Sequence, residues 1–459
     1  MLRWLRPKQN LAESEVAHGL RMLLADGVCG QTMMVLTTGA FLIAFAIQLG
    51  ASNTVIGLLS AVGPIAQVMQ IPTIALVERT RHRKALVVIA CFLNRSAFFV
   101  IAALPFFAPD NSKVVILLAA LLVHFGLGNV GGCAYNSWIR DLIPEEIMGG
   151  FFAKRMALAT AVGAGLSLLG GAGVDVYKHF AGNEIGAYTI LFSIGATAGI
   201  VGVVFLGKIA EPKMPDEPYR GIWPLIVQPF KDANFRRLLI YLGCWSFAVN
   251  FCGPFFAVYM ISRLNLNMTW ILALSVLSQL VNVLFFGIWD RLSDRFSNKS
   301  ALAVATPLFF LTFLIWPFTG MPHLAFLSIP LLILIHVMGG ISTAGVALCA
   351  TNLALKSAPY GKATAYLAVN ALVSGVAAAI SPVLAGLAAD LFAPYEIKVS
   401  LTWVNHLVDE VGRTLPTIDV RGLDFLFLTG FVFGTIAYSR ILSVKEEGEV
   451  AESVVRPAL

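Results

Sequence analysis

The chain has 459 residues, of which 58% are hydrophobic and only 13% are charged, whereas about 25% of the residues in ordinary soluble domains are charged. A water-soluble fold could not bury that much apolar surface, so the composition excludes a soluble protein and indicates one embedded in a lipid bilayer. The formal net charge is +6, but no basic surface with interleaved aromatic residues occurs, and we therefore expect no nucleic-acid partner.

Taken in chain order, charged residues and Pro/Gly breaks divide the sequence into twelve apolar runs, each close to the ~20 residues that a helix needs to cross a bilayer. The predicted spans of the first half are 27–49, 53–77, 85–108, 114–138, 156–175 and 187–209. Those of the second half are 238–262, 268–289, 301–319, 324–350, 365–391 and 424–443. The runs lack the two-residue alternation of barrel strands, so we predict an all-α polytopic membrane protein.

Lys and Arg residues are concentrated on one side of these spans. The side that holds both termini carries 25 of the 32, and the opposite loops carry 6. Positively charged loops stay in the cytoplasm, so we expect both termini there and the protein in the cytoplasmic (inner) membrane. We expect a cytoplasmic N-terminal segment, a six-helix half, a cytoplasmic connector, a second six-helix half and a cytoplasmic tail, over residues 1–21, 22–209, 210–237, 238–443 and 444–459.

Motifs of enzymes and metal sites are missing from the sequence. The six cysteines fall inside predicted spans and form no CxxC or Cys/His pattern, which favours packing roles over disulfides or a metal site. No GxxxxGK[ST] loop and no nucleophile–base pair occurs. We therefore expect neither an enzyme nor an ATP-driven pump, and no cofactor.

Two landmarks recur along the chain at nearly the same spacing. The segments VERTRHRKAL at 77–86 and SDRFSNKSAL at 293–302 share an acid, an arginine, a later base and an Ala-Leu pair, at an offset of 216. Pro144 to Asp175 and Pro359 to Asp390 each span 31 positions, at an offset of 215. The repeat predicts two six-helix halves in the same orientation.

Parallel six-helix repeats are typical of the major facilitator superfamily (MFS), and particular residues make the resemblance specific. DRLSDRFSNKSAL at 290–302 resembles the family's signature loop G-x-x-x-D-R-x-G-x-R-R, with Asp290 and Ser297 in place of the glycines. WIRDLIPEE at 138–146 resembles the family's loop between helices four and five. The resemblance covers roughly residues 20–445, and it implies the MFS fold and a transport function.

The resemblance also implies that the two signature loops form a cytoplasmic gate, whose acid lies against the N-terminus of a neighbouring helix. The alternative is that the bases of these loops only keep them in the cytoplasm. The residues that we assign to the gate are Glu78, Arg79, Arg83, Lys84, Asp294, Arg295 and Lys299.

Arg95 lies ten residues into the third predicted span, beside Asn94. An ionised group at that depth costs at least ~2.5–3.5 kcal/mol on insertion scales. A water-filled cavity or a charged partner could offset that cost, or the arginine could bridge helices through backbone carbonyls.

Other polar side chains within spans are candidates to line a substrate cavity, with packing between helices as the alternative for each. The resemblance places His124 and His336 on cavity-lining helices, where either histidine could carry a proton. Asp26, at the start of the first span, is a third candidate for proton coupling, and capping or a salt bridge is the alternative. The cavity candidates are Asn94, Arg95, His124, Asn250, Gln279, Asn282, His336, Asn370 and Ser374.

The loop between the last two spans, 393–422, carries an apolar stripe at helical spacing. This stripe predicts a helix on the outer membrane surface or over the outer mouth, formed by Val399, Trp403, Val404, Leu407, Val408 and Val411.

These observations predict a secondary active transporter that moves a small organic solute across the cytoplasmic membrane by alternating access, with proton coupling as an option. The expected partners are the solute, a coupling ion and the lipid bilayer, and we expect a monomer. A non-transporting membrane scaffold or assembly factor on the same fold is the alternative.

Overall fold

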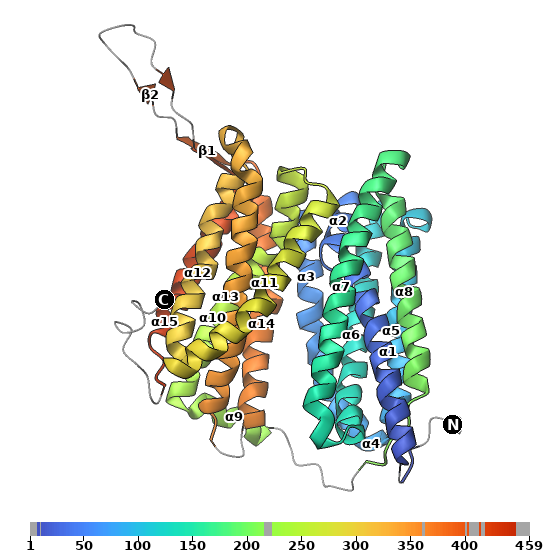
Figure 1. Ribbon diagram of the computed structural model, residues 1–459. Helices are drawn as coiled ribbons and strands as arrows, with labels where there is room; N and C mark the ends of the chain where they lie inside the picture. The colour runs from blue at the N-terminus through green and yellow to red at the C-terminus, as the bar shows by residue number, and fades with distance from the viewer. Residues whose placement is uncertain are drawn as a thin grey trace. The chain divides into compact units, whose positions relative to one another are not determined.

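The computed structural model describes residues 7–9, 11–214, 223–359, 363–399, 402–403, 413–414 and 418–446. Long helices make up most of this part of the chain (Figure 1). Eleven helical segments in it are long and apolar enough to cross a membrane. A twelfth helix, α15 (Leu423–Ile441), coincides with the last predicted span. The chain is therefore an all-α, multi-pass membrane protein, and the predicted fold class is confirmed.

Helices that coincide with the first six predicted spans begin or end beyond the apolar runs. They are α1 (Glu13–Thr37) with α2 (Ala40–Gln48), α3 (Asn53–Ala66) with the short η2 (Gln67–Met69) and α4 (Gln70–Thr80), α5 (Arg83–Phe107), α6 (Asp110–Leu142), α7 (Glu145–Ala181) and α8 (Ile185–Gly207). Polar residues continue a helix past its apolar part, and the hydropathy-based boundaries miss these turns. Asp26 and Arg155, predicted at a span's edge and in a loop, consequently lie well inside α1 and α7.

The second half repeats this order after a short helix in the predicted connector, α9 (Trp223–Lys231). Its helices are α10 (Ala233–Val258) with a π-helical turn η3 (Tyr259–Arg263), α11 (Met268–Arg295), α12 (Asn298–Thr319), η4 (Pro322–Leu327) with α13 (Ser328–Lys356), α14 (Ala363–Phe392) and α15.

Helix pairings within the first half recur in the second. Helix α1 packs against α7 and α8, and α5 packs against α6 and α8. In the same chain positions of the second half, α10 packs against α14 and α15, and α12 against α13 and α15. Such a recurrence is what a duplicated six-helix unit produces.

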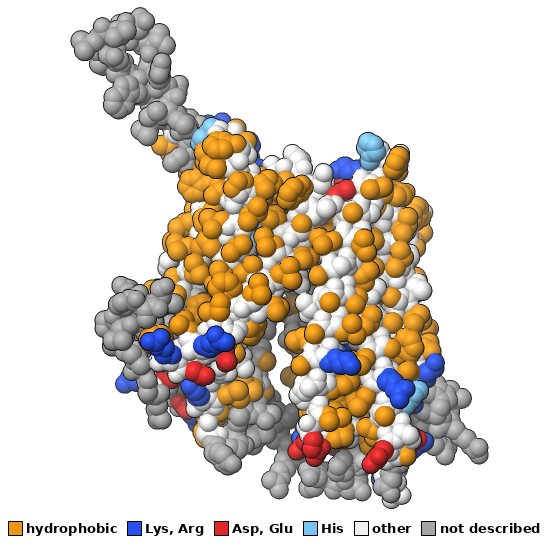
Figure 2. All heavy atoms as spheres, viewed as in Figure 1, with side chains coloured by type: hydrophobic (Ala, Val, Ile, Leu, Met, Phe, Trp, Pro, Cys, Tyr) orange, Lys and Arg blue, Asp and Glu red, His pale blue; other side chains and the backbone are white. Residues whose placement is uncertain are grey.

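The chain divides into two compact units. The first comprises Met1–Ala51, Leu58–Arg220 and Asn267–Leu272, and the second comprises Ser52–Gly57, Gly221–Leu266 and Ala273–Leu459. Large buried side chains form a core in each unit, around Leu23, Trp138 and Leu142 in the first and around Phe235, Trp289 and Leu353 in the second. On the face seen in Figure 2, hydrophobic side chains cover most of the helices, and most charged side chains gather near one end. The hydrophobic part of this face is the kind of surface that bilayer-spanning helices present to lipid.

In each unit an aspartate near the end of a long helix caps the first turn of another helix. Asp175 of α7 accepts the backbone N–H groups of Met268 (2.9 Å) and Thr269 (2.8 Å) in the first unit. Asp390 of α14 accepts those of Asn53 (3.2 Å) and Thr54 (2.9 Å) in the second. A carboxylate at this position satisfies free N–H groups and interacts favourably with the helix dipole. The two aspartates are the acids that the sequence repeat relates at an offset of 215, and the capped residues are also 215 positions apart.

The first predicted span is broken. Helix α1 ends at Thr37 and α2 begins at Ala40, and Gly39 between them has a φ of +61°. Glycine adopts this left-handed region without the steric cost that a Cβ brings. The break therefore leaves Thr38 outside both helices, in the middle of the first span.

The predicted helix in the 393–422 loop is wrong over the part that the structure describes, which includes Val399 and Trp403. Strand β1 (Glu396–Val399) pairs antiparallel with β4 (Ile418–Arg421), and β2 (Thr402–Trp403) pairs antiparallel with β3 (Arg413–Thr414). The strands are rich in Val, Ile, Thr and Trp, which favour extended backbone, and this preference outweighs the helical spacing of the apolar residues. The rest of the predicted stripe, Val404, Leu407, Val408 and Val411, lies outside the described residues.

Candidate functional site

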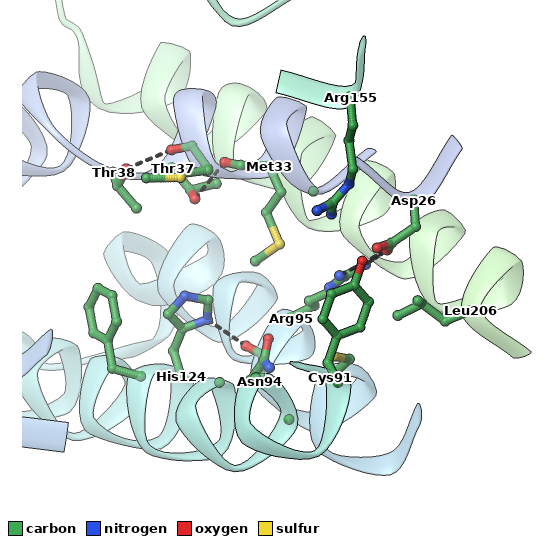
Figure 3. Close-up of a pocket in the computed structure, with 17 residues that line it drawn as sticks. Asp26, Met33, Thr37, Thr38, Cys91, Asn94, Arg95, His124, Arg155 and Leu206 are labelled. Carbon is green, nitrogen blue, oxygen red and sulfur yellow. Dashed lines mark hydrogen bonds and ion pairs between the residues drawn. The ribbon is translucent and has the colours of Figure 1, made fainter. Parts of the chain in front are cut away.

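A cavity of about 560 Å³ lies inside the first unit, between residues of α1, α5, α6, α7 and α8. Its volume is within the range of small-molecule sites, about 300–1,000 Å³. The polar residues that line it include Asp26, Asn94, Arg95, His124, Tyr135 and Arg155. Met33, Met34 and Phe125 contribute apolar surface. Figure 3 shows Arg95 and Arg155 on either side of Asp26, with Asn94 and His124 further along the cavity.

Asp26 and Arg95 form an ion pair in the wall of this cavity. Oδ1 of Asp26 accepts hydrogen bonds from Nη1 and Nη2 of Arg95, at 3.1 Å each. Nη1 of Arg95 also donates to the backbone carbonyl of Gly199, at 2.6 Å. The guanidinium of Arg95 thus has a charged partner, bonds a backbone carbonyl of another helix and lines a cavity.

Two glycines of α8 make room for the pair. A Cβ built on Gly202 would lie 2.4 Å from Nη1 of Arg95 and 2.9 Å from Oδ1 of Asp26. A Cβ on Gly199 would lie 2.4 Å from the sulfur of Met33 and 3.2 Å from Cδ of Arg95. The contacts below 3 Å are far shorter than ordinary van der Waals distances, so a larger residue at either position would displace a neighbouring side chain.

Arg155 reaches the cavity from α7. Its guanidinium lies over the ring of Tyr135, 5.7 Å from the ring centroid. A Cβ on Gly27 of α1 would lie 2.8 Å from Nε of Arg155, so the arginine packs directly against the backbone of α1. Sequence reasoning misses both Arg155 and Tyr135. The signal for Arg155 is an arginine just ahead of a span whose predicted start, 156, lies eleven residues after the true helix start at Glu145.

His124 lies beside Asn94 in the same cavity. Its Nδ1 donates to the backbone carbonyl of Asn94 across 2.9 Å, since a carbonyl can only accept. The rings of Phe98 and Phe125 pack edge-to-face with the imidazole, with ring centroids 4.7 and 5.0 Å away. With Nδ1 fixed as a donor, Nε2 is the nitrogen free to exchange a proton.

The break in the first span also borders the cavity, because Thr37 and Thr38 are among its lining residues. The hydroxyl groups of both threonines donate to carbonyls of α1, those of Met33 (2.7 Å) and Met34 (2.6 Å). Each hydroxyl oxygen retains lone pairs that can accept a further hydrogen bond.

The cavity candidates of the second half lie in other places. Asn250 donates to the carbonyl of Ser246 (2.8 Å), whose hydroxyl donates to the carbonyl of Ser374 (2.8 Å). Ser374 in turn donates to Oδ1 of Asn370, at 3.3 Å. These four residues form one polar cluster between α10 and α14 in the second unit.

The remaining candidates of that half are separate from this cluster. Asn282 of α11 donates to the hydroxyl of Thr343 on α13, at 3.0 Å. Nδ1 of His336 donates to the carbonyl of Leu332 in its own helix, at 2.8 Å. Gln279 is exposed. The structure thus brings Asn94, Arg95, His124 and Asp26 into one cavity and leaves these three residues outside it.

The predicted gate residues of the first half centre on Arg83, whose side chain is fully buried. Its guanidinium forms an ion pair with Asp141 and donates to the carbonyls of Ser137 (3.0 Å) and Pro212 (2.9 Å). Its backbone N–H donates to Glu211, at 2.8 Å. Burial raises the pKa of the Glu211 carboxyl above its usual range, against the lowering effect of the N–H groups and guanidinium around it. Arg83 therefore holds the end of its own unit together, and Lys84 beside it is also buried.

A second glutamate binds the start of α12 in the other half. Glu446 accepts from Nδ2 of Asn298 (2.9 Å), from the backbone N–H of Lys299 (2.7 Å) and from Nζ of Lys356 (3.2 Å). Of the other gate candidates, Glu78 is half-buried, and Arg79, Asp294 and Arg295 are exposed. The gate itself stays a prediction.

Comparison with known proteins assigns the family. The sequence model of the Major Facilitator Superfamily matches residues 27–382, which is more than half of the chain. The chain belongs to the major facilitator superfamily. No curated protein matches the sequence of this facilitator.

Solved structures of transporters share its fold. A point mutant of the nucleoside transporter NupG superposes with a TM-score of 0.67 at 12% identity, covering 94% of this facilitator and 100% of NupG. A bacterial homologue of the human lysosomal transporter Spinster gives 0.63 at 14% identity, with coverage of 95% and 98%. A bacterial homologue of the iron transporter ferroportin gives 0.63 at 12% identity, with coverage of 95% and 99%. At these identities the likeness shows the fold alone.

Proposed function

We propose that this major facilitator protein is a secondary active transporter of the cytoplasmic membrane that moves a small organic solute by alternating access. The polar cavity in the first unit is the observation that carries the proposal. An ion pair, a histidine and an arginine whose Nε has no protein partner line one cavity among the long helices, and because charge is costly among membrane-spanning helices, a cavity that takes a polar solute or ion gives these groups a function.

Family and neighbours support the same proposal. The chain belongs to a family of transporters, and solved structures with its fold include a nucleoside transporter, a lysosomal-type transporter homologue and an iron transporter homologue. Duplicated six-helix units are the architecture on which alternating access operates. We further propose that both termini face the cytoplasm, as the loop charges predict, and that the transporter works as a monomer.

His124 and Asp26 are the proposed groups for proton coupling. His124 has one ring nitrogen free for a proton, and Asp26 changes the charge of the ion pair if it is protonated. His336, whose Nδ1 is bound within its own helix, is the candidate in the second half.

Flux into proteoliposomes tests the transport function without requiring that the solute be chosen in advance. Purified protein in liposomes is exposed to an isotope-labelled extract of small metabolites, and the contents are identified by mass spectrometry. We expect at least one solute to enter faster than into protein-free liposomes, and its rate to change when a pH gradient is imposed if protons are coupled. A membrane scaffold predicts that no solute enters faster than through the bare bilayer, and that result would refute transport.

A further inference from the structure

The cavity of the first unit is lined by more positive than negative charge. Its lining residues include two arginines, Arg95 and Arg155, and Asp26 as the single acid. Arg95 and Asp26 are bound to one another. The lining therefore carries one positive charge in excess, and Arg155, which lies near Asp26 in Figure 3, forms no ion pair with it.

Arg155 and Tyr135 each have a polar atom without a hydrogen-bond partner among the described residues. Nε of Arg155 and the hydroxyl of Tyr135 are both shielded from solvent, and neither forms a hydrogen bond within the described part of the chain. Leaving a buried polar group unpaired costs about 1–3 kcal/mol, and more when the group is charged. The two groups belong to neighbouring side chains, because the guanidinium lies over the tyrosine ring.

Arg83 shows what a structural arginine looks like in the same unit. Its Nε, Nη1 and Nη2 all donate to protein acceptors, and two carboxylates neutralise its charge. Arg155 is half-buried, its Nε donates to no acceptor within the described part of the chain, and the acid of the cavity wall, Asp26, pairs with Arg95 instead. The contrast indicates that the guanidinium of Arg155 binds a group that enters the cavity.

The chemistry of that group follows from its surroundings. A guanidinium next to a hydroxyl offers adjacent donors and one positive charge, which suit a carboxylate better than a neutral or cationic group. Met33, Met34 and Phe125 line the same cavity and offer apolar contacts. A small molecule with an anionic group and an apolar part matches both the hydrogen-bond donors and the apolar lining of the cavity.

We propose that Arg155 and Tyr135 form an anion subsite, and that the transported solute is a small organic monocarboxylate. Its carboxylate binds Arg155 and Tyr135, and its apolar part contacts Met33, Met34 and Phe125. The inference rests on the proposed function in that it names the class of the solute.

The first test needs no ligand. In an empty anion subsite the charge of the arginine is not neutralised, and this destabilises the protein. Arg155→Gln should therefore unfold at a higher temperature than wild type in detergent solution with low chloride. Arg83→Gln is the matched control and should unfold at a lower temperature, since it removes a fully paired arginine. A clear loss of stability in Arg155→Gln would make Arg155 a structural residue and overturn the subsite.

The second test is binding to purified protein, with benzoate and hexanoate as probes and benzamide and hexanamide as their neutral controls at equal ionic strength. We expect at least one carboxylate to bind at least tenfold more tightly than its amide. Arg155→Gln should abolish this preference, and Arg155→Lys should retain part of it. Tyr135→Phe should weaken carboxylate binding severalfold. Lys154→Gln, which removes an exposed base next in sequence, should bind as wild type does.

Equal binding of acids and amides, or an unchanged preference in Arg155→Gln, would overturn the anion subsite. The binding result is separable from transport. If carboxylates bind but nothing crosses the bilayer, the subsite stands and the transport proposal fails. If a neutral or cationic solute crosses and carboxylates neither bind nor compete, transport stands and the anion assignment fails.

Discussion

Arg95 and Asp26 are 69 positions apart in the sequence, yet one oxygen of Asp26 accepts hydrogen bonds from both terminal nitrogens of Arg95. Asp26 is buried and Arg95 nearly so, with exposed fractions of 5% and 12% for their side chains. Removal of one partner from such a pair leaves the other charge uncompensated, which costs about 3–5 kcal/mol. We therefore expect Arg95→Ala to lower the free energy of unfolding by that amount, measured by denaturation in mixed detergent micelles.

The double variant Asp26→Ala/Arg95→Ala should be less destabilised than the sum of the two single variants, because it leaves no lone charge. In the flux assay Arg95→Lys should retain part of the activity that Arg95→Ala loses. Wild-type stability and flux in Arg95→Ala would show that the pair has no role.

Gly202 is the position where the pair is most sensitive to added volume. Gly202→Ala places a methyl group 2.4 Å from Nη1 of Arg95, and overpacking of this kind typically costs about 1–3 kcal/mol. We expect a lower unfolding temperature and reduced flux. Gly165→Ala in α7 is the control, since a Cβ there meets nothing within 4 Å and alanine favours the helix. Equal effects of the two substitutions would exclude the steric explanation.

Asp390 and Asp175 should contribute to stability in the same way. Asp390 also accepts from the side chains of Asn53 (2.9 Å) and Thr54 (2.6 Å), so it holds four hydrogen bonds. Loss of a helix cap costs about 0.5–2 kcal/mol, and we expect Asp390→Ala and Asp175→Ala each to lower the free energy of unfolding within that range. Asp390→Asn should recover part of the loss, because its amide oxygen still accepts. A loss confined to one aspartate would argue against the equivalence of the two caps.

Glu446 predicts a pH dependence of stability. Burial of this carboxyl raises its pKa, but hydrogen bonds from Asn298, the Lys299 N–H and Lys356 outweigh burial, and the pKa is lowered. A carboxyl whose pKa is lower in the folded than in the unfolded state contributes stability above its unfolded pKa of about 4.3. That contribution is lost as the pH falls through the folded pKa. Unfolding temperatures measured from pH 7 downwards should therefore fall less steeply in Glu446→Gln than in wild type, and parallel curves would contradict the role of Glu446.

Apolar run length is enough to predict the helices, and the repeat is enough to predict their order in two halves. Every span must cross the bilayer, so each segment has an apolar run of its own that can be recognised in the sequence. Helix ends are predicted poorly because polar turns continue beyond the bilayer. The error matters most at Arg155, which the sequence places in a loop and therefore outside the cavity.

The composition of the cavity can be predicted only in part. Arg95 stands out because a charge within a span requires a partner, and Asp26 is a candidate for a salt bridge on the same grounds. Their pairing depends on how α1, α5 and α8 pack, and hydropathy contains no information on that. Tyr135 gives no signal, since a tyrosine inside a span is ordinary until its hydroxyl is found without a partner. The β-strands at 396–421 are missed because the same apolar positions fit a helix and a strand.

The link from Arg95 to both Asp26 and Gly199 has a consequence for biosynthesis. Helix α5 is synthesised after α1 but well before α8. Arg95 can therefore pair with Asp26 as soon as α5 has been made, whereas the carbonyl of Gly199 is present only after α8 has been made. We therefore expect the six helices of this half to resist protease and extraction only once the sixth has been made. Nascent chains truncated before Gly199 should be sensitive to both.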